Sequence, residues 1–285
     1  MSLDGEEDIR GAYCAMTIIS LLNLPLSLPY DSPTDITRQQ TFLTNLGEWL
    51  GRCQTYEGGI GQAPDNEAHG AYAFCCLACL CIMDAPRISI PKFLNVDRLV
   101  SWLSARQSAP EGSFSGRTNK LVDACYSHWV GGCWAPLEAA LSSASQARKT
   151  TNLWDREGLI RYTLCCSQTA NGGLRDKPGT KADAYHSCYS LAGLSAAQNY
   201  WTYQDTNPHR TNGESSFDSD GVEDVSSLLA AFNWIPQRAS AEERTAWAID
   251  EEDTVSLVHP VYVIPPRMVE RVKAQFEHVT GFKTA

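Results

Sequence analysis

The sequence has 285 residues, of which 43% are hydrophobic and eight are Trp, so it can bury a large core in one or two globular domains. Its formal net charge of -10 argues against a general affinity for nucleic acid or anionic membrane, so a phosphate ligand would need a local cluster of cations. The eleven Cys are an odd number and often lie in apolar runs. This predicts reduced, buried thiols in a cytoplasmic protein rather than a disulfide framework.

The longest apolar run, residues 71–83, has almost no polar face and is too short to span a bilayer. It predicts a helix that is buried on all sides. We therefore expect a protein with no membrane span, and the sequence shows no signal or transit peptide pattern.

Three segments share a layout in which a Gln is followed by a Gly turn. In chain order these turns are CQTYEGGIG (53–61), RQSAPEGSFSG (106–116) and SQTANGGLRD (167–176). An amphipathic helical pattern precedes each turn, at 42–53, 96–106 and 156–166, and a more apolar segment follows it, at 68–80, 122–134 and 183–195. The unit of outer helix, turn and inner helix recurs roughly every 50 to 60 residues. We predict an all-α fold in which these hairpins form an α/α toroid, with residues 1–285 as a single domain.

The beginning of the chain resembles the start of a predicted inner helix. The stretch DIRGAYC (8–14) matches VDACYSH (122–128) in its Asp, small residue, aromatic residue and Cys, but no outer helix or Gly turn precedes it. The pattern therefore starts in the middle of a repeat, and we expect a toroid that is incomplete at the N-terminus. A chance match over seven residues is the alternative.

Polar residues cluster at the predicted starts of the inner helices. They are His69 in the first copy, Asp123, Cys125 and Tyr126 in the second, and Asp183, Tyr185 and His186 in the third. If the inner helices are parallel, their N-termini meet at one rim, where the helix dipoles favour an anion. Asp123, Cys125 and His186 offer three donors that zinc accepts, and a fourth position would stay open for water or substrate. The structural alternative is an N-cap Asp, a buried Cys and a capped core His.

Seven stretches of the sequence resemble the β subunits of the protein prenyltransferases, most closely those of the farnesyl type. They lie within about residues 4–267 and read DIRGAYC, CQTYEGGIG, EAHGAYAFC, GRTNKLVDACYSHW, LRDKPG, DAYHSCYSLAGLS and HPVYVI. The resemblance implies a zinc-dependent enzyme that pairs with an α subunit. Such an enzyme moves a farnesyl group from farnesyl diphosphate to the Cys of a C-terminal CaaX sequence.

The resemblance also implies roles for individual residues. The family's zinc ligands fall on Asp123, Cys125 and His186, which the repeat had already grouped. The residues implied to act on the diphosphate are His69, Arg117, Lys120 and Tyr126, and those implied to contact the substrates are Arg10, Tyr13, Tyr72, Cys75, Trp129, Tyr185 and Tyr189. Arg117 and Lys120 are the local cations that a diphosphate would need in this acidic chain.

Two residues bear on which prenyl group is used. Asp176, in LRDKPG, stands where the farnesyl-type enzymes have a carboxylate that binds magnesium near the diphosphate, and Tyr189 resembles the farnesyl-type residue at its position. Both favour the farnesyl type over the geranylgeranyl type I enzyme, which remains an alternative. Without the resemblance, Asp176 is explained as a turn residue in a Gly/Pro-rich loop. A third alternative is an inactive fragment that only binds an α subunit.

The segment 203–227 is polar, acidic and rich in Ser, Asn and Gly. This composition is typical of chain that cannot bury enough apolar surface to pack into a core. We expect a mobile excursion from the surface there, rather than part of the site.

Overall fold

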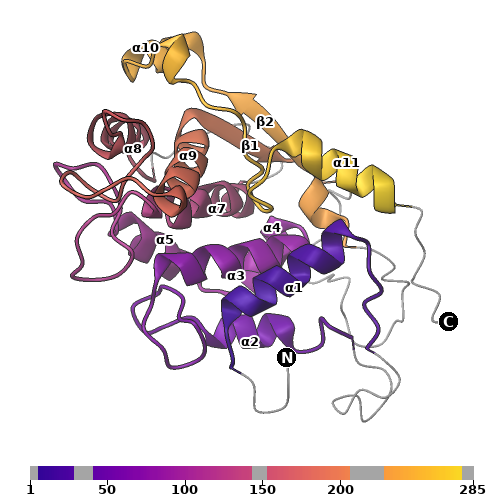
Figure 1. Cartoon of the computed structure of the whole chain (residues 1–285). Coiled ribbons are helices and arrows are strands. Elements are labelled where there is room, and N and C mark those ends of the chain that lie inside the picture. Colours follow the sequence, from indigo (N-terminus) through magenta and orange to yellow (C-terminus); the bar gives the residue numbers. More distant parts are fainter. Residues whose placement is uncertain (1–5, 29–40, 143–152, 206–227, 278–285) are drawn as a thin grey trace.

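Helices dominate the chain, and the inner helices of successive repeats lie side by side. The computed structural model describes residues 6–28, 41–142, 153–205 and 228–277, so most of the expected excursion at 203–227 lies outside the described residues. The inner elements are α1 (Ile9–Leu21), α3 (Gly70–Met83), α6 (Tyr126–Trp129) with α7 (Trp134–Leu141), and α9 (Ala184–Gln198). The outer helices are α2 (Leu46–Arg52), α5 (Val96–Ser104) and α8 (Arg156–Tyr162). In Figure 1, α3 occupies the centre and α1 packs along it.

The predicted all-buried helix at 71–83 is α3. From Ala73 to Met83 every residue is buried, because α3 contacts α1 on one side and α4, α6 and α7 on others. Helix α4 (Pro86–Phe93) was not predicted, and it follows α3 after a break of two residues. Pro86 occupies its first position, where the absent backbone N–H costs no hydrogen bond.

The second inner helix is interrupted, which the sequence pattern did not predict. After the single turn of α6, residues Gly131–Cys133 form a 3₁₀ turn, and α7 then continues. A Cβ on Gly132 would lie 3.2 Å from the rings of both Phe74 and His128. Glycine thus allows this segment to approach α3 closely, at the cost of a regular helix.

A repeated backbone hydrogen bond joins the starts of α1, α3 and α6 to the loop of the next repeat. Ile9 N donates to Gln62 O (3.0 Å), Gly70 N to Gly116 O (2.8 Å) and Ala124 N to Asp176 O (3.0 Å). The three acceptors hold equivalent positions, each two residues after the apolar residue that ends the Gly turn. These bonds hold the helix N-termini beside one another at one rim.

The Gln of the turn ties one repeat to the outer helix of the next. Gln107 Nε2 donates to Gly112 O and Asp155 O, both at 2.7 Å, and its Oε1 accepts from Asp155 N at 2.8 Å. Gln54 makes the same three kinds of contact with Gly58 and Asn95. Asn95 and Asp155 are the N-caps of α5 and α8. One side chain therefore closes its own turn and fixes the start of the following helix.

The C-terminal part adds a small antiparallel sheet to the helices. Strand β1 (Asn199–Tyr203) continues directly from α9 and pairs with β2 (Trp234–Arg238). Short helices α10 (Ala241–Ala246) and α11 (Pro266–Phe276) follow, and the loop between them returns to α1. There Tyr13 Oη donates to Val261 O at 2.6 Å, and Ser20 Oγ lies 2.6 Å from Tyr262 Oη.

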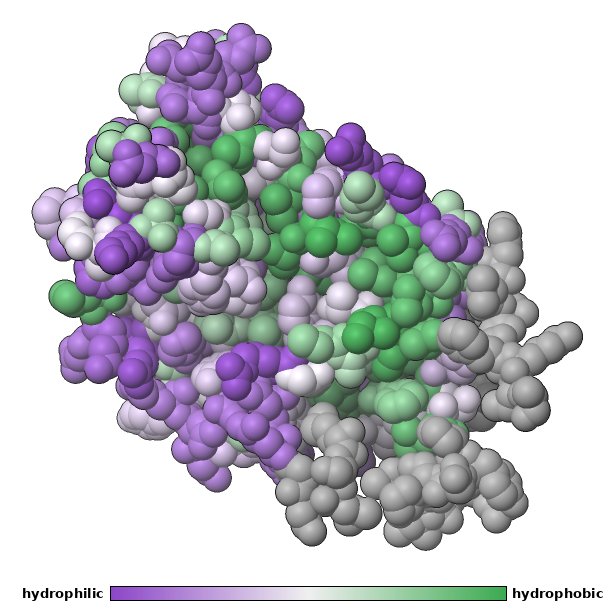
Figure 2. All heavy atoms as spheres, in the orientation of Figure 1, coloured by the Kyte–Doolittle hydropathy of each residue, from purple (hydrophilic) through white to green (hydrophobic). Residues whose placement is uncertain are grey.

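Surface character differs between these parts. In Figure 2 the surface over α10 is hydrophilic, whereas apolar side chains gather over α1 and beside α11. Ile18 on α1 is 52% exposed. Within the described residues, no helix combines the length and apolarity needed to cross a bilayer.

The Gln contacts predict a measurable cost for breaking them. Gln107→Ala removes three short hydrogen bonds, so we expect a loss of about 2 kcal/mol in the free energy of unfolding. Gln168 holds the equivalent position in the third copy, but it is exposed, so Gln168→Ala is a matched control with a smaller loss. Urea unfolding of both variants measures the difference, and equal losses would contradict the proposed tie.

Candidate functional site

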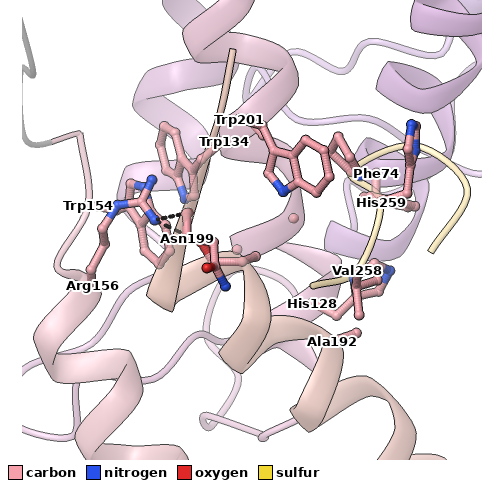
Figure 3. A pocket seen from close by; sticks show the side chains of 15 residues that line it. Phe74, His128, Trp134, Trp154, Arg156, Ala192, Asn199, Trp201, Val258 and His259 are labelled. Atoms are coloured by element: carbon pink, nitrogen blue, oxygen red, sulfur yellow. Dashed lines mark hydrogen bonds between the residues drawn. The ribbon is translucent and has the colours of Figure 1, made fainter. Parts of the chain in front are cut away.

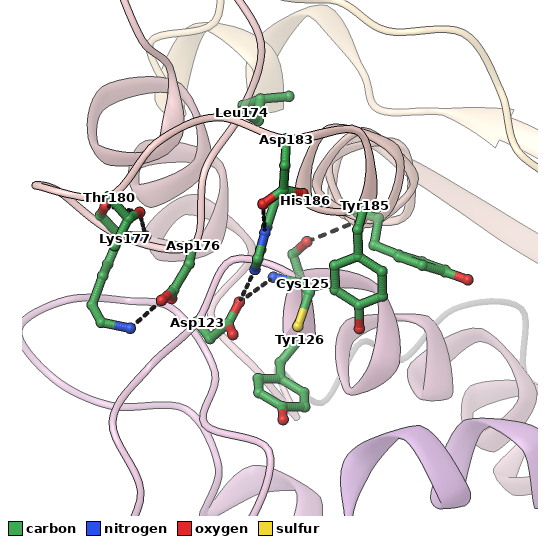
Figure 4. A network of polar contacts seen from close by, with 12 residues as sticks. Asp123, Cys125, Tyr126, Leu174, Asp176, Lys177, Thr180, Asp183, Tyr185 and His186 are labelled. Carbon is green, nitrogen blue, oxygen red and sulfur yellow. Dashed lines mark hydrogen bonds and ion pairs between the residues drawn. The ribbon is translucent and has the colours of Figure 1, made fainter.

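Three metal-type donors from two neighbouring helix starts converge at the rim. Asp123 and Cys125 lie just before α6, and His186 lies in the first turn of α9. One donor atom from each lies within 4.8 Å of the other two, which suits a common cation (Figure 4). The bond from Ala124 N to Asp176 O brings the two helix starts to this distance.

Asp183 orients the imidazole of this group. It is the N-cap of α9, where its Oδ1 accepts from His186 N at 2.8 Å. Its Oδ2 lies 2.7 Å from His186 Nδ1, so Nε2 is directed to Asp123 Oδ1, at 3.3 Å. Hydrogen bonds from the backbone and ring of His186 hold the pKa of Asp183 below its usual value. A carboxylate behind a histidine imidazole is common at metal sites; the sequence placed Asp183 in the polar cluster but assigned it no separate role.

Burial keeps the thiol of Cys125 protonated in the absence of a cation. Burial raises the pKa of Cys125 well above its usual value, and the charge of Asp123 raises it further. Asp123 also accepts a hydrogen bond from Cys125 N at 2.8 Å. The helix-capping contacts that could by themselves explain these polar residues are therefore present. They still leave the Cys125 thiol and His186 Nε2 close enough to share a ligand (Figure 4).

A neutral histidine supports a tyrosine hydroxyl beside this group. His69 is the N-cap of α3, and its Nδ1 accepts from Ala71 N at 3.1 Å. Burial, and then the nearby charge of Arg117, lower the pKa of His69. The proton of the neutral ring is therefore on Nε2, which lies 3.0 Å from Tyr126 Oη. Tyr126 thus accepts from His69 and can donate its own hydrogen to a ligand.

The two predicted cations lie on the loop that precedes α6. Arg117 Nη1 donates to Glu67 Oε2 at 2.5 Å, and both side chains are partly exposed. Lys120 is exposed on the same loop. Sequence reasoning missed Glu67, whose position two residues before the His69 cap places it opposite this loop.

Aromatic rings form a wall next to the polar rim. The rings of Trp129 and Tyr189 lie 4.4 Å apart, those of Tyr185 and Tyr189 4.9 Å, and Trp129 Nε1 donates to Tyr185 Oη at 3.1 Å. Phe74 extends the wall, with centroids 5.9 Å from both Trp129 and Tyr13. The sequence did not single out Phe74, because it lies within a uniformly apolar helix.

The remaining predicted contacts lie around α1 and α3. The guanidinium of Arg10 lies 5.6 Å from the ring centroid of Tyr72 and pairs with Asp8. Tyr72 Oη donates to Gln62 at 3.2 Å. Cys75 is buried on α3, which raises the pKa of its thiol to about 12.

Asp176 lies beside the three donors but is engaged elsewhere. Its carbonyl accepts from Ala124 N at 3.0 Å and from Tyr162 Oη at 3.1 Å, and one carboxylate oxygen pairs with Lys177. The other oxygen is buried and has no hydrogen-bond partner among the residues that the structure describes. An unsatisfied carboxylate oxygen suits a cation.

His128 backs the aromatic wall and lines a pocket (Figure 3). Its ring lies 4.4 Å from Phe74, 4.8 Å from Trp129 and 5.3 Å from Tyr189. Its Nε2 is buried and finds no partner within the described parts of the chain. Burial lowers the pKa of His128 to about 3, so the ring is neutral. Trp134, Trp201 and His259 also line this pocket.

Comparisons with known proteins agree with the predicted resemblance and confirm the predicted fold class. Residues 1–264 match the family described as the prenyltransferase alpha-alpha toroid domain. The chain is 52% identical to the protein farnesyltransferase subunit β of Pyricularia oryzae, over 99% of this chain and 52% of that protein. It is 34% identical to the protein farnesyltransferase subunit β of Schizosaccharomyces pombe, over 96% and 59% respectively.

A solved structure shows the same fold. Candida albicans protein geranylgeranyltransferase-I complexed with GGPP aligns with 98% of this chain and 58% of its own, with a TM-score of 0.58 and 21% identity. The chain therefore spans only between half and three fifths of the length of these relatives.

The buried His128 predicts a specific dependence of stability on acid. Its folded pKa of about 3 lies below that of the unfolded chain, so its contribution to stability is complete above about pH 6.5 and falls as the pH decreases towards 3. Between pH 7 and 5 this histidine should lower the free energy of unfolding by about 2 kcal/mol. In His128→Phe this contribution to the pH dependence should be absent. Urea unfolding at both pH values tests it. An unchanged loss in the variant would show that His128 is not the cause.

Proposed function

The chain belongs to the prenyltransferase alpha-alpha toroid family, and we propose that it is the β subunit of a zinc-dependent protein farnesyltransferase. With an α subunit, in the cytoplasm, it would transfer the farnesyl group of farnesyl diphosphate to the Cys of C-terminal CaaX sequences. The observation that carries the proposal is the convergence of Asp123, Cys125 and His186 beside a cationic loop and an aromatic wall. The similarity to two proteins named protein farnesyltransferase subunit β supports the farnesyl type.

The donor set fits zinc and leaves room for a substrate. A thiolate, a carboxylate and an imidazole are ligands that zinc accepts, and three protein ligands leave the fourth position open. When bound, zinc would lower the pKa of the substrate thiol so that a thiolate is present at neutral pH. Asp183 would hold His186 in the tautomer that presents Nε2.

The loop cations and Tyr126 would act on the leaving group. As the substrate sulfur bonds to carbon 1 of the isoprenoid, the carbon–oxygen bond breaks and the diphosphate gains negative charge. Arg117 and Lys120 would stabilise that charge through charge-assisted hydrogen bonds, after Arg117 exchanges Glu67 for the diphosphate. Tyr126 Oη accepts a hydrogen bond from His69 Nε2, so the hydroxyl hydrogen of Tyr126 would be free to be donated to the diphosphate.

The aromatic wall would bind the isoprenoid. Trp129, Tyr185 and Tyr189 present flat rings whose positions are fixed by mutual packing and by the bond between Trp129 Nε1 and Tyr185. Tyr13, Tyr72 and Cys75 would continue the apolar surface, with Arg10 at its edge. Tyr189 and Asp176 are the residues that favour farnesyl over geranylgeranyl.

The metal assignment is tested with a pair of cysteine variants. Cys125→Ala should lose bound zinc and farnesyl transfer to a CaaX peptide, because it removes one of three donors. Cys188→Ala is the control, since Cys188 is exposed on the same helix as His186. Metal analysis of the chain and a transfer assay with an α subunit provide the measurements. Unchanged zinc in Cys125→Ala would refute the metal site, and faster use of geranylgeranyl diphosphate by the wild type would refute the farnesyl type.

Asp176 predicts a dependence on magnesium. Its buried oxygen, which has no hydrogen-bond partner within the described ranges, would hold Mg²⁺ together with diphosphate oxygens and so offset the charge that grows on the leaving group. Activity of the chain with an α subunit should therefore rise with added magnesium. Asp176→Lys should remove that dependence without abolishing transfer, because a fixed cation would replace the ion. An unmodified enzyme indifferent to magnesium would return Asp176 to the role of a turn residue.

A further inference from the structure

The loop that carries Arg117 and Lys120 departs from the repeat at Thr118. The equivalent positions in the other two copies, four residues after the apolar end of each Gly turn, are Pro64 and Pro178. Proline has no side-chain donor or acceptor, so it cannot make polar contacts of the kind that Thr118 makes. Residues common to the copies serve the shared fold, so a departure on this loop calls for a separate explanation.

Thr118 bridges a cation and a carboxylate from two different repeats. Its Oγ1 donates to Glu57 Oε2 at 2.8 Å and accepts from Arg106 Nη1 at 3.0 Å. A hydroxyl has only one hydrogen, so these two contacts fix its orientation. Both partners carry a charge, and hydrogen bonds to charged groups are stronger than those between neutral groups.

Both ends of this bridge are themselves anchored on Trp102. Glu57 Oε2 also accepts from Trp102 Nε1 at 3.1 Å. Arg106 is only 7% exposed, its guanidinium lies 4.8 Å from the Trp102 ring centroid, and its Nε donates to Trp102 O at 3.3 Å. The positions equivalent to Arg106 are Cys53 and Ser167, so this buried cation is a second departure from the repeat.

The residue before Arg117 is held separately. Gly116 O accepts from Gly70 N at 2.8 Å, and a Cβ on Gly116 would lie 2.0 Å from the Tyr126 ring. The backbone is therefore fixed on one side of Arg117 by Gly116 and on the other by Thr118. Asn119 follows with φ 59°, and this left-handed residue turns the chain to Lys120.

We propose that Glu57, Thr118 and Arg106 form a clasp that positions the cations of the 117–120 loop for a diphosphate group. They are positioning residues, because each acts through the loop and not on the substrate. The proposal rests on the proposed function for its ligand, but the clasp itself rests only on contacts within this chain. A clasped loop keeps its cations in place before the ligand binds, which lowers the entropy lost on binding.

Thr118→Val is the principal test, because valine has the shape of threonine without the hydroxyl. With the full chain loaded with zinc, calorimetry should show inorganic diphosphate binding about tenfold more weakly, because the variant loses the hydrogen bonds of Thr118 to both Glu57 and Arg106. Thr118→Ser should restore affinity to within about twofold of wild type. Thr245→Val is the matched control, since it removes a 2.9 Å hydroxyl–backbone bond in α10, which belongs to the C-terminal part.

Hydrogen exchange separates the clasp from its ligand. The amides of residues 116–120 should exchange faster in Thr118→Val than in wild type without any ligand, while zinc content stays the same. Unchanged exchange and unchanged diphosphate affinity would overturn the clasp. Faster exchange in a chain whose wild type binds no diphosphate would keep the clasp and overturn the proposed function. If Thr118→Val fails to fold, Glu57→Gln, at an exposed position, should show the same weakening and the same faster exchange.

Discussion

The site depends on one repeated backbone hydrogen bond, from the starts of α1, α3 and α6 to the loop of the next repeat. Where Ala124 N donates to Asp176 O, that bond brings the start of α6 beside the start of α9. Asp123, Cys125 and His186 meet there as a consequence. Because α1 and α3 are joined to the next loop in the same way as α6, the positive ends of the helix dipoles also gather at this rim, where they favour an anionic ligand.

Burial determines the protonation of the groups around the rim. His69 and His128 are kept neutral because a charged imidazole would lose its hydration, and the thiol of Cys125 is kept protonated for the same reason. A neutral His69 frees the Tyr126 hydroxyl to donate. A buried thiol beside a carboxylate would gain its charge when a cation shares the site, so the proposed metal binding would be coupled to proton release there.

The repeat distinguishes residues that build the shared fold from those that are specific to one copy. Gln54 and Gln107 make the same contacts in their own copies, as expected for scaffold residues. Thr118 and Arg106 have no counterparts of the same type in the other copies. They meet each other on the loop that carries two cations, which a purely structural repeat would not require.

By itself the sequence determined the helical hairpins, their order and the three metal-type donors, because periodicity and the Gln/Gly turns are local features read along the chain. Its helix boundaries failed at Gly131–Cys133, where close packing against Phe74 decided the geometry. Only the tertiary structure showed that Asp183 orients His186, that Glu67 forms an ion pair with Arg117, and that Glu57 accepts a hydrogen bond from Thr118. The last two contacts join residues 50 and 61 positions apart in the sequence. The packing of separate repeats determines such partners, so no local sequence pattern predicts them.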